Sequence, residues 1–350
     1  MKLKFWQTSD PIYMDDVSDK STGSLAARVA GGAVSVYLLG VIALGWWWDS
    51  EPDQFAVREN AARMAETNNQ GVVTGYTTTA TFIQLSDIML NKRGGYLSND
   101  LFPPGVWMDN IPEWEFGVLM VLRDTARVYR QDFSRSQSQS VEDEDLSQAE
   151  GPYFFDNNSW VLPASEDSYQ EGQELFTNYL NRLADPNATD AQFYARADNL
   201  VVWLAAMETR LGSLSQRLSA SVGKRQLNTD LAGDAAASQA TDAPRDQVVK
   251  TPWLELDNVF YQTRGFTWAL LHLLRAMEQD FGDVLDKKNA RVSLQQIIRE
   301  LEPTQETLWS PMVLNGDGLG MLANHSLVMA SYVARANAAM ADLRVLLMQG

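Results

Sequence analysis

Four carboxylates and two tryptophans lie close together in the stretch RGGYLSNDLFPPGVWMDNIPEWEFG, residues 93–117. Enzymes that cleave glycans use one carboxyl group as an acid and a second one as a base or nucleophile. Indole rings beside such a pair would contact the sugar. The candidate catalytic residues are Asp100, Asp109, Glu113 and Glu115, and the candidate binding residues are Trp107 and Trp114.

The same stretch also has the composition of a connection between two helices. Gly94 and Gly95 are typical of a helix C-terminus, and Asn110 can cap the next helix. Between them, two consecutive prolines force an extended passage. This interpretation accounts for nearly every residue, so we expect a helix-connecting corner, with a glycan site as the alternative.

Asp87 is a further candidate acid. In a helix over residues 74–93 it shares one face with the side chains of Tyr76, Ala80, Ile83 and Leu90. Burial would raise the pKa of its carboxyl group unless a cation such as Lys92 or Arg93 pairs with it. We expect a structural ion pair here rather than a catalytic acid.

The composition excludes several classes of site. The chain of 350 residues has no cysteine and two histidines, His272 and His325. This rules out thiolate catalysis, iron–sulfur clusters and cysteine-ligated zinc, and it leaves little for a histidine-rich metal site. The net charge of −17 argues against nucleic acid as a partner. We therefore expect no cofactor, no metal and no nucleic acid, and we place His272 at the edge of the core.

A second aromatic segment, PYFFDNNSWVLP, stands outside any helical pattern. Its large side chains could plug the helix bundle or form a lip that binds a partner. We expect plugging, with partner binding as the alternative. The residues concerned are Tyr153, Phe154, Phe155 and Trp160.

The segment from Val29 to Trp48 carries no charge. At ~1.5 Å per residue it is about 30 Å long, which is the thickness of a bilayer hydrocarbon core. It ends in three consecutive tryptophans, as at an interfacial aromatic belt, and no small-residue cleavage site follows it. We predict an uncleaved signal anchor over residues 25–48.

Basic residues set the predicted orientation of this span, because cytoplasmic flanks are enriched in them. Lys2, Lys4, Lys20 and Arg28 precede its apolar part, whereas Arg58 and Arg63 follow it. We predict a cytoplasmic tail over residues 1–24 and a periplasmic domain at the inner membrane of a bacterium. Small residues at Ala27, Gly31 and Ser35 could let two spans pack into a homo-oligomer.

The exported part is dominated by helical periodicity. Long helices are predicted over residues 190–222, 254–287 and 322–347, and shorter ones over residues 74–93, 112–133, 167–184 and 290–302. In the second long helix, Gly265 indicates a kink or a tight crossing with another helix. The fold class is therefore all-α, a transmembrane helix followed by a multi-helix bundle.

Two polar stretches interrupt these helices. Residues 134–151 are predicted to form a solvated loop, and residues 223–250 a flexible linker. The linker divides the exported part into residues 49–222 and residues 251–350, with the second part packing on the first.

Three phrases give the chain a family resemblance: residues 93–117, DFSRSQSQSVEDEDL and PYFFDNNSWVLPASEDSY. On these the chain resembles a family of proteobacterial inner-membrane proteins known only as a domain of unknown function. The resemblance covers nearly the whole chain and implies one N-terminal span. It implies no activity, cofactor or catalytic residue. It also cautions that the polar segment could be structured.

These features favour a membrane-anchored scaffold or accessory protein of the cell envelope, which acts by binding envelope proteins rather than by catalysis. The first alternative is a domain that binds or hydrolyses peptidoglycan with the carboxylates and tryptophans named above. It requires at least two of those carboxylates in one open cleft with Trp107 or Trp114. The second alternative is a ligand sensor that works through a partner, which requires a closed apolar pocket between the helices.

Overall fold

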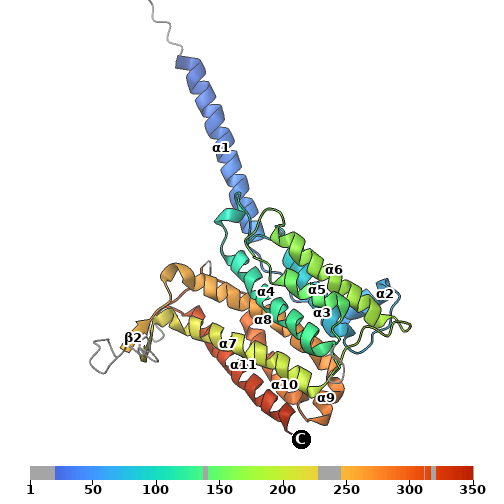
Figure 1. Ribbon diagram of the computed structural model, residues 1–350. Helices are drawn as coiled ribbons and strands as arrows, with labels where there is room; N and C mark the ends of the chain where they lie inside the picture. The colour runs from blue at the N-terminus through green and yellow to red at the C-terminus, as the bar shows by residue number, and fades with distance from the viewer. Residues whose placement is uncertain (1–19, 137–140, 228–245, 311, 317–320, 350) are drawn as a thin grey trace, which may run out of the picture.

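The computed structural model describes residues 20–136, 141–227, 246–310, 312–316 and 321–349. This part of the chain is almost entirely helical, as the sequence predicts. One long helix projects from one end of a helical domain, and the last helix ends at the opposite end (Figure 1).

The elements of the first half begin with the projecting helix. They are α1 (Lys20–Trp48), α2 (Val57–Thr67), α3 (Tyr76–Asn91), the short 3₁₀ turn η1 (Gly105–Trp107), α4 (Asn110–Val128), the π-helical turn η2 (Tyr129–Phe133), α5 (Glu144–Tyr153), α6 (Ser165–Ala184) and α7 (Ala197–Ser219).

The second half contains a small β ribbon and four more helices. The elements are η3 (Ala220–Val222), β1 (Lys224–Leu227), β2 (Asp246–Val249), η4 (Trp253–Glu255), α8 (Leu256–Asp280), α9 (Gly282–Lys287), α10 (Arg291–Leu301), η5 (Glu302–Gln305) and α11 (His325–Met348).

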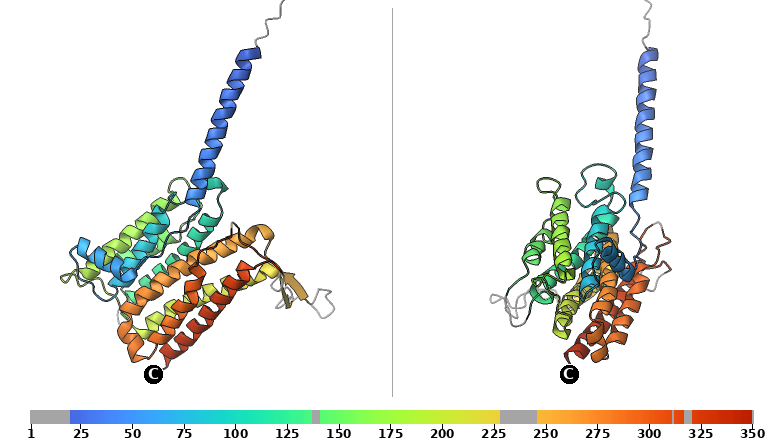
Figure 2. Two further views of the ribbon diagram at one scale, coloured as in Figure 1. Left: turned by 180° about the vertical axis from the view of Figure 1, so that it is seen from behind. Right: turned by 90° about the vertical axis from the view of Figure 1, so that its right-hand side faces the viewer.

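Helices from before and after the ribbon pack into one hydrophobic core. α4 lies along α8, α7 lies along α11, and α5 and α6 cover α3 and α4 from one side, as Figure 2 shows from two further directions. One face of α11 is buried, formed by Ser326, Met329, Val333, Ala336, Met340, Leu343 and Leu347. On α8 the buried apolar side chains include Val259, Phe260, Phe266, Leu270, Leu274 and Met277, and Phe281, which follows the helix, is buried as well.

Two glycines allow α4 and α8 to cross with their backbones in contact. A Cβ on Gly265 would lie 1.9 Å from the carbonyl oxygen of Trp114, and one on Gly117 would lie 2.1 Å from that of Gln262. Such distances are far below van der Waals contact, so only glycine fits at either position. Of the two alternatives left open for Gly265, the structure shows the tight crossing.

The helix predicted to begin at residue 190 begins at Ala197 instead. The residues before it bond to the end of η2, since the Tyr194 amide donates to the Phe133 carbonyl oxygen at 2.7 Å. Phe193 is nevertheless buried, at 9 % exposure, although it precedes the helix. Tertiary contacts of this loop outweigh the local periodicity.

The polar segment predicted as a solvated loop contains α5. Asp143 caps this helix by accepting bonds from the Asp145 and Leu146 amides, both at 3.1 Å. Arg182 of α6 pairs with both Asp143 and Asp145. Partnered carboxylates therefore stabilise a helix that the composition conceals, and the loop prediction is wrong for residues 144–151.

The predicted linker begins and ends in paired strands. β1 and β2 are antiparallel, with Lys224 opposite Val249 and Leu227 opposite Asp246. Residues 228–245 of the linker lie outside the described residues.

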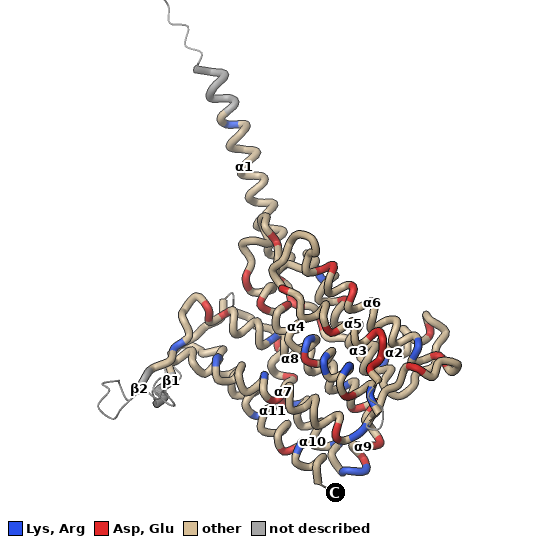
Figure 3. The backbone as a smooth tube through the Cα atoms, in the orientation of Figure 1, with Lys and Arg blue, Asp and Glu red and all other residues tan. Residues whose placement is uncertain are grey.

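α1 contains one stretch, Ala27–Trp48, that is long and apolar enough to cross a membrane. Figure 3 shows most of this helix without Lys, Arg, Asp or Glu, whereas charged residues are spread over the domain. Most of its described side chains are exposed. A helix buried in a soluble core would have the opposite property.

Candidate functional site

The lower end of α1 rests on the segment that connects α3 to α4, which we call the collar, residues 93–110. Val41, Gly45 and Trp48 lie on one face of α1, at spacings of four and three residues. Val41 is buried, at 5 % exposure, and a Cβ on Gly45 would lie 3.3 Å from Cβ of Pro104. The Trp48 indole covers Gly94 so closely that a Cβ there would lie 2.8 Å from the ring.

Polar contacts extend this seat just below the helix. The Arg93 guanidinium donates to the Ser50 hydroxyl at 3.0 Å, and the side chain of Asn110 hydrogen-bonds Asp49. Burial raises the pKa of Asp49, and the nearby Asp109 raises it further. The collar thus contacts both α1 and the residues that follow α1 in the chain.

Glu115 holds the collar in its folded shape. Its carboxylate is fully buried and accepts bonds from the Leu97 amide at 2.8 Å and from the Ser98 amide at 2.9 Å. The Ser98 hydroxyl donates to it at 2.5 Å, and Lys92, only 3 % exposed, forms an ion pair with it. With every oxygen engaged, Glu115 is a structural residue of the corner.

The segment after α1 is fixed to the domain by a second ion pair, formed by Glu51 and Arg264 of α8. Nε of Arg264 lies 2.6 and 2.9 Å from the two carboxylate oxygens, and Nη2 lies 2.5 Å from one of them. Nη1 donates to the carbonyl oxygens of Thr304 and Glu306. The two side chains are 19 % and 8 % exposed, so this bidentate pair is shielded from water.

Four residues after Glu51, Phe55 contacts His272 of α8. The Phe55 amide donates to Nε2 of His272 at 3.1 Å, while Nδ1 lies 2.7 Å from the Trp268 carbonyl oxygen. The Phe55 ring stacks on the imidazole with centroids 4.2 Å apart. Burial lowers the pKa of His272 to about 4. The neutral ring, with the proton on Nδ1, satisfies both contacts.

We call these two contacts the clamp: Glu51 with Arg264, and Phe55 with His272. Sequence reasoning missed the role of Glu51, Phe55 and Arg264. The partners are separated by 213 and 217 residues, so no local pattern marks them. The buried His272 itself was expected at the edge of the core, and the structure places it inside, with 0 % exposure.

The candidate carboxylates do not converge on one cleft. Asp100 turns inward under the collar, where a Cβ on Gly105 would lie 1.9 Å from Oδ2 of Asp100, and burial raises its pKa. Glu113 is half-buried on α4, and burial again raises its pKa. Asp109 is exposed beside Asp49. Glu115 is buried in the ion pair described above.

Asn110, which the sequence suggested as a cap, is the first residue of α4, and the position before it is Asp109.

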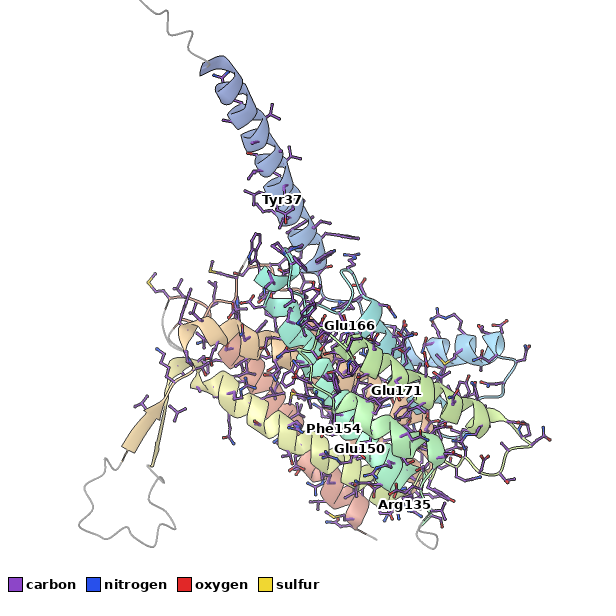
Figure 4. The ribbon with its side chains drawn as sticks, turned by 45° about the horizontal axis from the view of Figure 1, so that its top comes forward. Tyr37, Arg135, Glu150, Phe154, Glu166 and Glu171 are labelled. Carbon is purple, nitrogen blue, oxygen red and sulfur yellow. The ribbon has the colours of Figure 1, made fainter. Side chains whose placement is uncertain are left out.

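The candidate aromatic residues divide into two groups. Trp114 and Tyr153 are fully buried, so neither is available to a ligand. Tyr153 fits the expected plugging, since its hydroxyl bonds to Ser86 at 3.0 Å and its ring packs on Phe82. Phe155 is partly buried against the core. Trp107, Phe154 and Trp160 are exposed by 63 %, 39 % and 59 %; Figure 4 shows Phe154 among the helices of the domain, away from α1.

Asp87 is half-buried and accepts a hydrogen bond from the side-chain amide (Nδ2) of Asn91 at 2.9 Å. It is not the buried carboxylate that the sequence suggested, because α3 turns this position toward a groove. The expected ion pair is not formed among the described residues, since Lys92 pairs with Glu115 and Arg93 donates to Ser50. That groove, of about 300 Å³, lies between α3 and α6 and is lined by polar residues such as Glu166 and Gln170.

Two larger hollows flank the clamp and are open to solvent. One, of about 540 Å³, lies between residues 50–53 and the end of α3. The other, of about 390 Å³, lies between the same segment and α8, and includes Tyr261 and Trp268. Within the part of the chain that the structure describes, no group of three His, Asp or Glu side chains could hold a metal ion.

Fold and site together define a class of protein: a helical domain seated on the end of one apolar helix, with its most elaborate contacts at that junction. A family described as an uncharacterized protein conserved in bacteria, DUF2333, matches residues 20–350, and the chain belongs to this family. The family resemblance deduced from the sequence is thereby confirmed. Searches of curated proteins and of solved structures found no match.

Proposed function

We propose that this protein is a single-span inner-membrane protein whose periplasmic helical domain is a scaffold that binds other proteins of the cell envelope. The observation that carries the proposal is the clamp, which ties the domain to the base of the apolar helix at Glu51 and Phe55.

A tethered enzyme that acts on a diffusible substrate needs only a flexible linker. Here a shielded ion pair and a stacked ring fix the segment that leaves α1, so the domain is held in one orientation relative to the span. Fixed orientation benefits a surface that must meet a partner in the same membrane, because less rotational freedom is lost on binding.

The arrangement of the carboxylates supports binding over glycan cleavage. Glu115 is buried in an ion pair with Lys92, and Trp114 is buried as well, so neither of them is accessible to a sugar. The hollows beside the clamp are open, whereas a ligand sensor would use a closed apolar pocket.

The topology is tested with single cysteines in a chain that has none of its own. Val345→Cys on α11, 49 % exposed, is expected to react with a membrane-impermeant maleimide added to cells with a permeabilised outer membrane. Labelling of this cysteine only after the inner membrane is opened would contradict the periplasmic location.

Partner binding is tested by photocrosslinking in intact cells, with a crosslinking amino acid at exposed positions of the domain. We expect the same envelope protein to be captured from neighbouring positions, and less of it when Glu51→Gln loosens the clamp. Asp53→Asn, on the same segment but exposed, is the matched control. Release of glycan fragments by the purified protein, without reproducible capture, would favour the hydrolase instead.

A further inference from the structure

An unusual set of exposed apolar side chains surrounds the base of α1. In the collar, Phe102 is 79 % exposed, Trp107 63 %, and Leu101 and Val106 both 48 %. In the loop between α5 and α6, Leu162 is 93 % exposed, with Trp160 and Val161 beside it at 59 % and 53 %. Large apolar side chains exposed together mark a surface that is covered by something else.

We propose that these two loops form an apolar rim that is inserted into the outer interface of the lipid bilayer around the span. The rim consists of Leu101, Phe102, Val106, Trp107, Trp160, Val161 and Leu162. This inference rests on the proposed function in one respect, namely that α1 crosses a membrane.

The length of α1 places the collar at the level of the bilayer. The apolar stretch has 22 residues, or ~33 Å at 1.5 Å per residue, and a hydrocarbon core of ~30 Å requires nearly all of it. Pro104 contacts Gly45, however, and Val41 is buried one turn above. The last ~10 Å of the span therefore has collar residues beside it, and these residues must lie at the membrane boundary.

The collar loop is built to tolerate that environment. Residues 101–108 carry no charge, and Asp100 and Asp109 bracket them. Two of the eight residues are prolines without an amide N–H. The amides of Val106, Trp107 and Met108 donate to carbonyl oxygens within the loop at 3.1, 2.9 and 2.9 Å. Few backbone donors are thus left to be desolvated, as burial in lipid requires.

The second loop is hydrogen-bonded to the collar and also contains an uncharged stretch. Residues 157–165 carry no charge between Asp156 and Glu166. The side-chain amide (Nδ2) of Asn99 donates to the Ser159 carbonyl oxygen at 2.7 Å, and the Tyr96 hydroxyl donates to the Asn157 carbonyl oxygen at 3.0 Å. Figures 1 and 2 show both loops at the end of the domain from which α1 projects.

Figure 4 shows Tyr37 on α1 beyond the domain and Glu166 at the end of α6 that lies toward α1. Glu166 follows the second uncharged stretch in the chain, so this loop ends at the side of the domain that lies toward α1. Since residues 101–108 and 157–165 contain no Lys or Arg, insertion depends on apolar side chains and indole rings, and not on anionic headgroups.

The test uses the full chain reconstituted in phosphatidylcholine vesicles that contain lipids with nitroxide-labelled acyl chains. Phe102→Cys, Val106→Cys and Leu162→Cys are each labelled with an environment-sensitive fluorophore. We expect the nitroxide lipids to quench all three, in low and in high salt. The matched control is Val292→Cys, exposed by 76 % near the start of α10 at the far end of the domain, which is expected to stay unquenched.

Leu38→Cys, in the middle of the apolar stretch, separates the two possible failures. If Leu38→Cys is quenched while the three rim positions are not, the rim inference is wrong and the span stands. If Leu38→Cys is not quenched either, the span itself is wrong. Protection of the rim cysteines by a protein or by a second copy of the chain, without quenching by lipid, would also overturn the inference.

Discussion

Two shielded ion pairs, Lys92 with Glu115 and Glu51 with Arg264, fix the chain around the base of α1. A buried pair is weak support for stability in itself, because desolvation of both charges opposes their attraction. Loss of one partner is costly, however, since the other charge then stays buried and unpaired. In this protein the two ion pairs hold separate segments of the chain together, and Glu115, a catalytic candidate in the sequence, is one of the residues that form them.

Glu115→Gln is expected to lower the free energy of unfolding by roughly 3–5 kcal/mol, because Lys92 keeps its charge in a buried site. Thermal or denaturant unfolding in detergent micelles measures the change. Glu113→Gln, two residues away and half-buried, is the control and is expected to have little effect. Equal stability of the two variants would show that the Lys92 ion pair does not hold the collar.

His272 makes the stability of the domain depend on pH. Burial lowers its pKa from 6.5 in the unfolded chain to about 4 in the folded protein. Between these values the unfolded state binds more protons, so folding stability falls as the pH decreases from 6.5 toward 4. Below the folded pKa the loss is complete, at about 3 kcal/mol.

Unfolding measured between pH 7 and pH 4 tests this expectation. His272→Gln is expected to show a weaker loss of stability on acidification than the wild-type protein, because the titrating group is gone. His325→Gln is the control, since burial lowers the pKa of His325 also but that residue is only partly buried. A pH profile of His272→Gln that matches the wild type would contradict the argument.

At the scale of elements, the crossing of α4 and α8 sets the position of the collar relative to the clamp. α4 begins at the end of the collar, and α8 carries Arg264 and His272 of the clamp. Because the two helices touch through Gly117 and Gly265, the collar and the clamp are held on neighbouring surfaces. A wider separation of these helices would move the collar, on which α1 rests, away from Arg264 and His272, which contact the segment after α1.

Gly265→Ala is expected to destabilise the domain by about 3 kcal/mol or more, because its methyl group would meet the Trp114 carbonyl oxygen and push the helices apart. Gly212→Ala on α7 is the matched control. Its Cβ would have one ordinary contact, at 3.7 Å from the Asn337 side chain, so a gain of ~0.5–1 kcal/mol is expected from helix propensity. Unfolding curves of the two variants that shift together would refute the tight crossing.

The clamp predicts how α1 moves relative to the domain. Glu51→Gln removes the charge that Arg264 binds, so the segment at residues 49–55 is expected to become mobile and open to proteases while the core stays folded. A spin label attached near this segment in reconstituted protein measures the mobility. Asp53→Asn should leave the spectrum unchanged; unchanged mobility in Glu51→Gln as well would mean that the clamp is dispensable.

At the scale of the whole molecule, apolar and acidic surfaces are separated. The net charge is −17, yet residues 101–108 and 157–165, which contain the rim, carry no charge. An acidic body is repelled by anionic headgroups, so under the two proposals attachment comes from the span and the rim. The domain would then stand at a fixed height above the membrane, with the rest of its surface free for a partner.

The intact protein is expected to stay in the membrane pellet after washing with high salt or alkaline carbonate, and to be released by detergent. A variant with Leu38→Arg and Leu39→Arg should appear in the soluble fraction, since each charge at the centre of a span costs about 2.5–3.5 kcal/mol. Release of the wild-type protein by carbonate would contradict a spanning helix.

The sequence alone determined most of the helical segments and the one that is apolar enough to span a membrane. Both properties depend on residues within a few turns of each other, so the period of apolar side chains and the length of an uncharged run are sufficient. The same locality explains the errors. Nothing near residue 144 reveals that Arg182 partners the acidic residues around α5, and nothing near residue 190 reveals that η2 holds the loop before α7.

Only the tertiary structure decided what the conspicuous residues do. Trp114, Glu115 and Tyr153 have the chemistry of a site, but packing of α4 against α8 and of α5 against α6 buries them. The clamp joins residues more than two hundred positions apart, a proximity that exists only once the core has formed. Burial and long-range pairing are properties of the packed chain. For that reason only the folded structure shows that Glu115 and the collar support the base of α1.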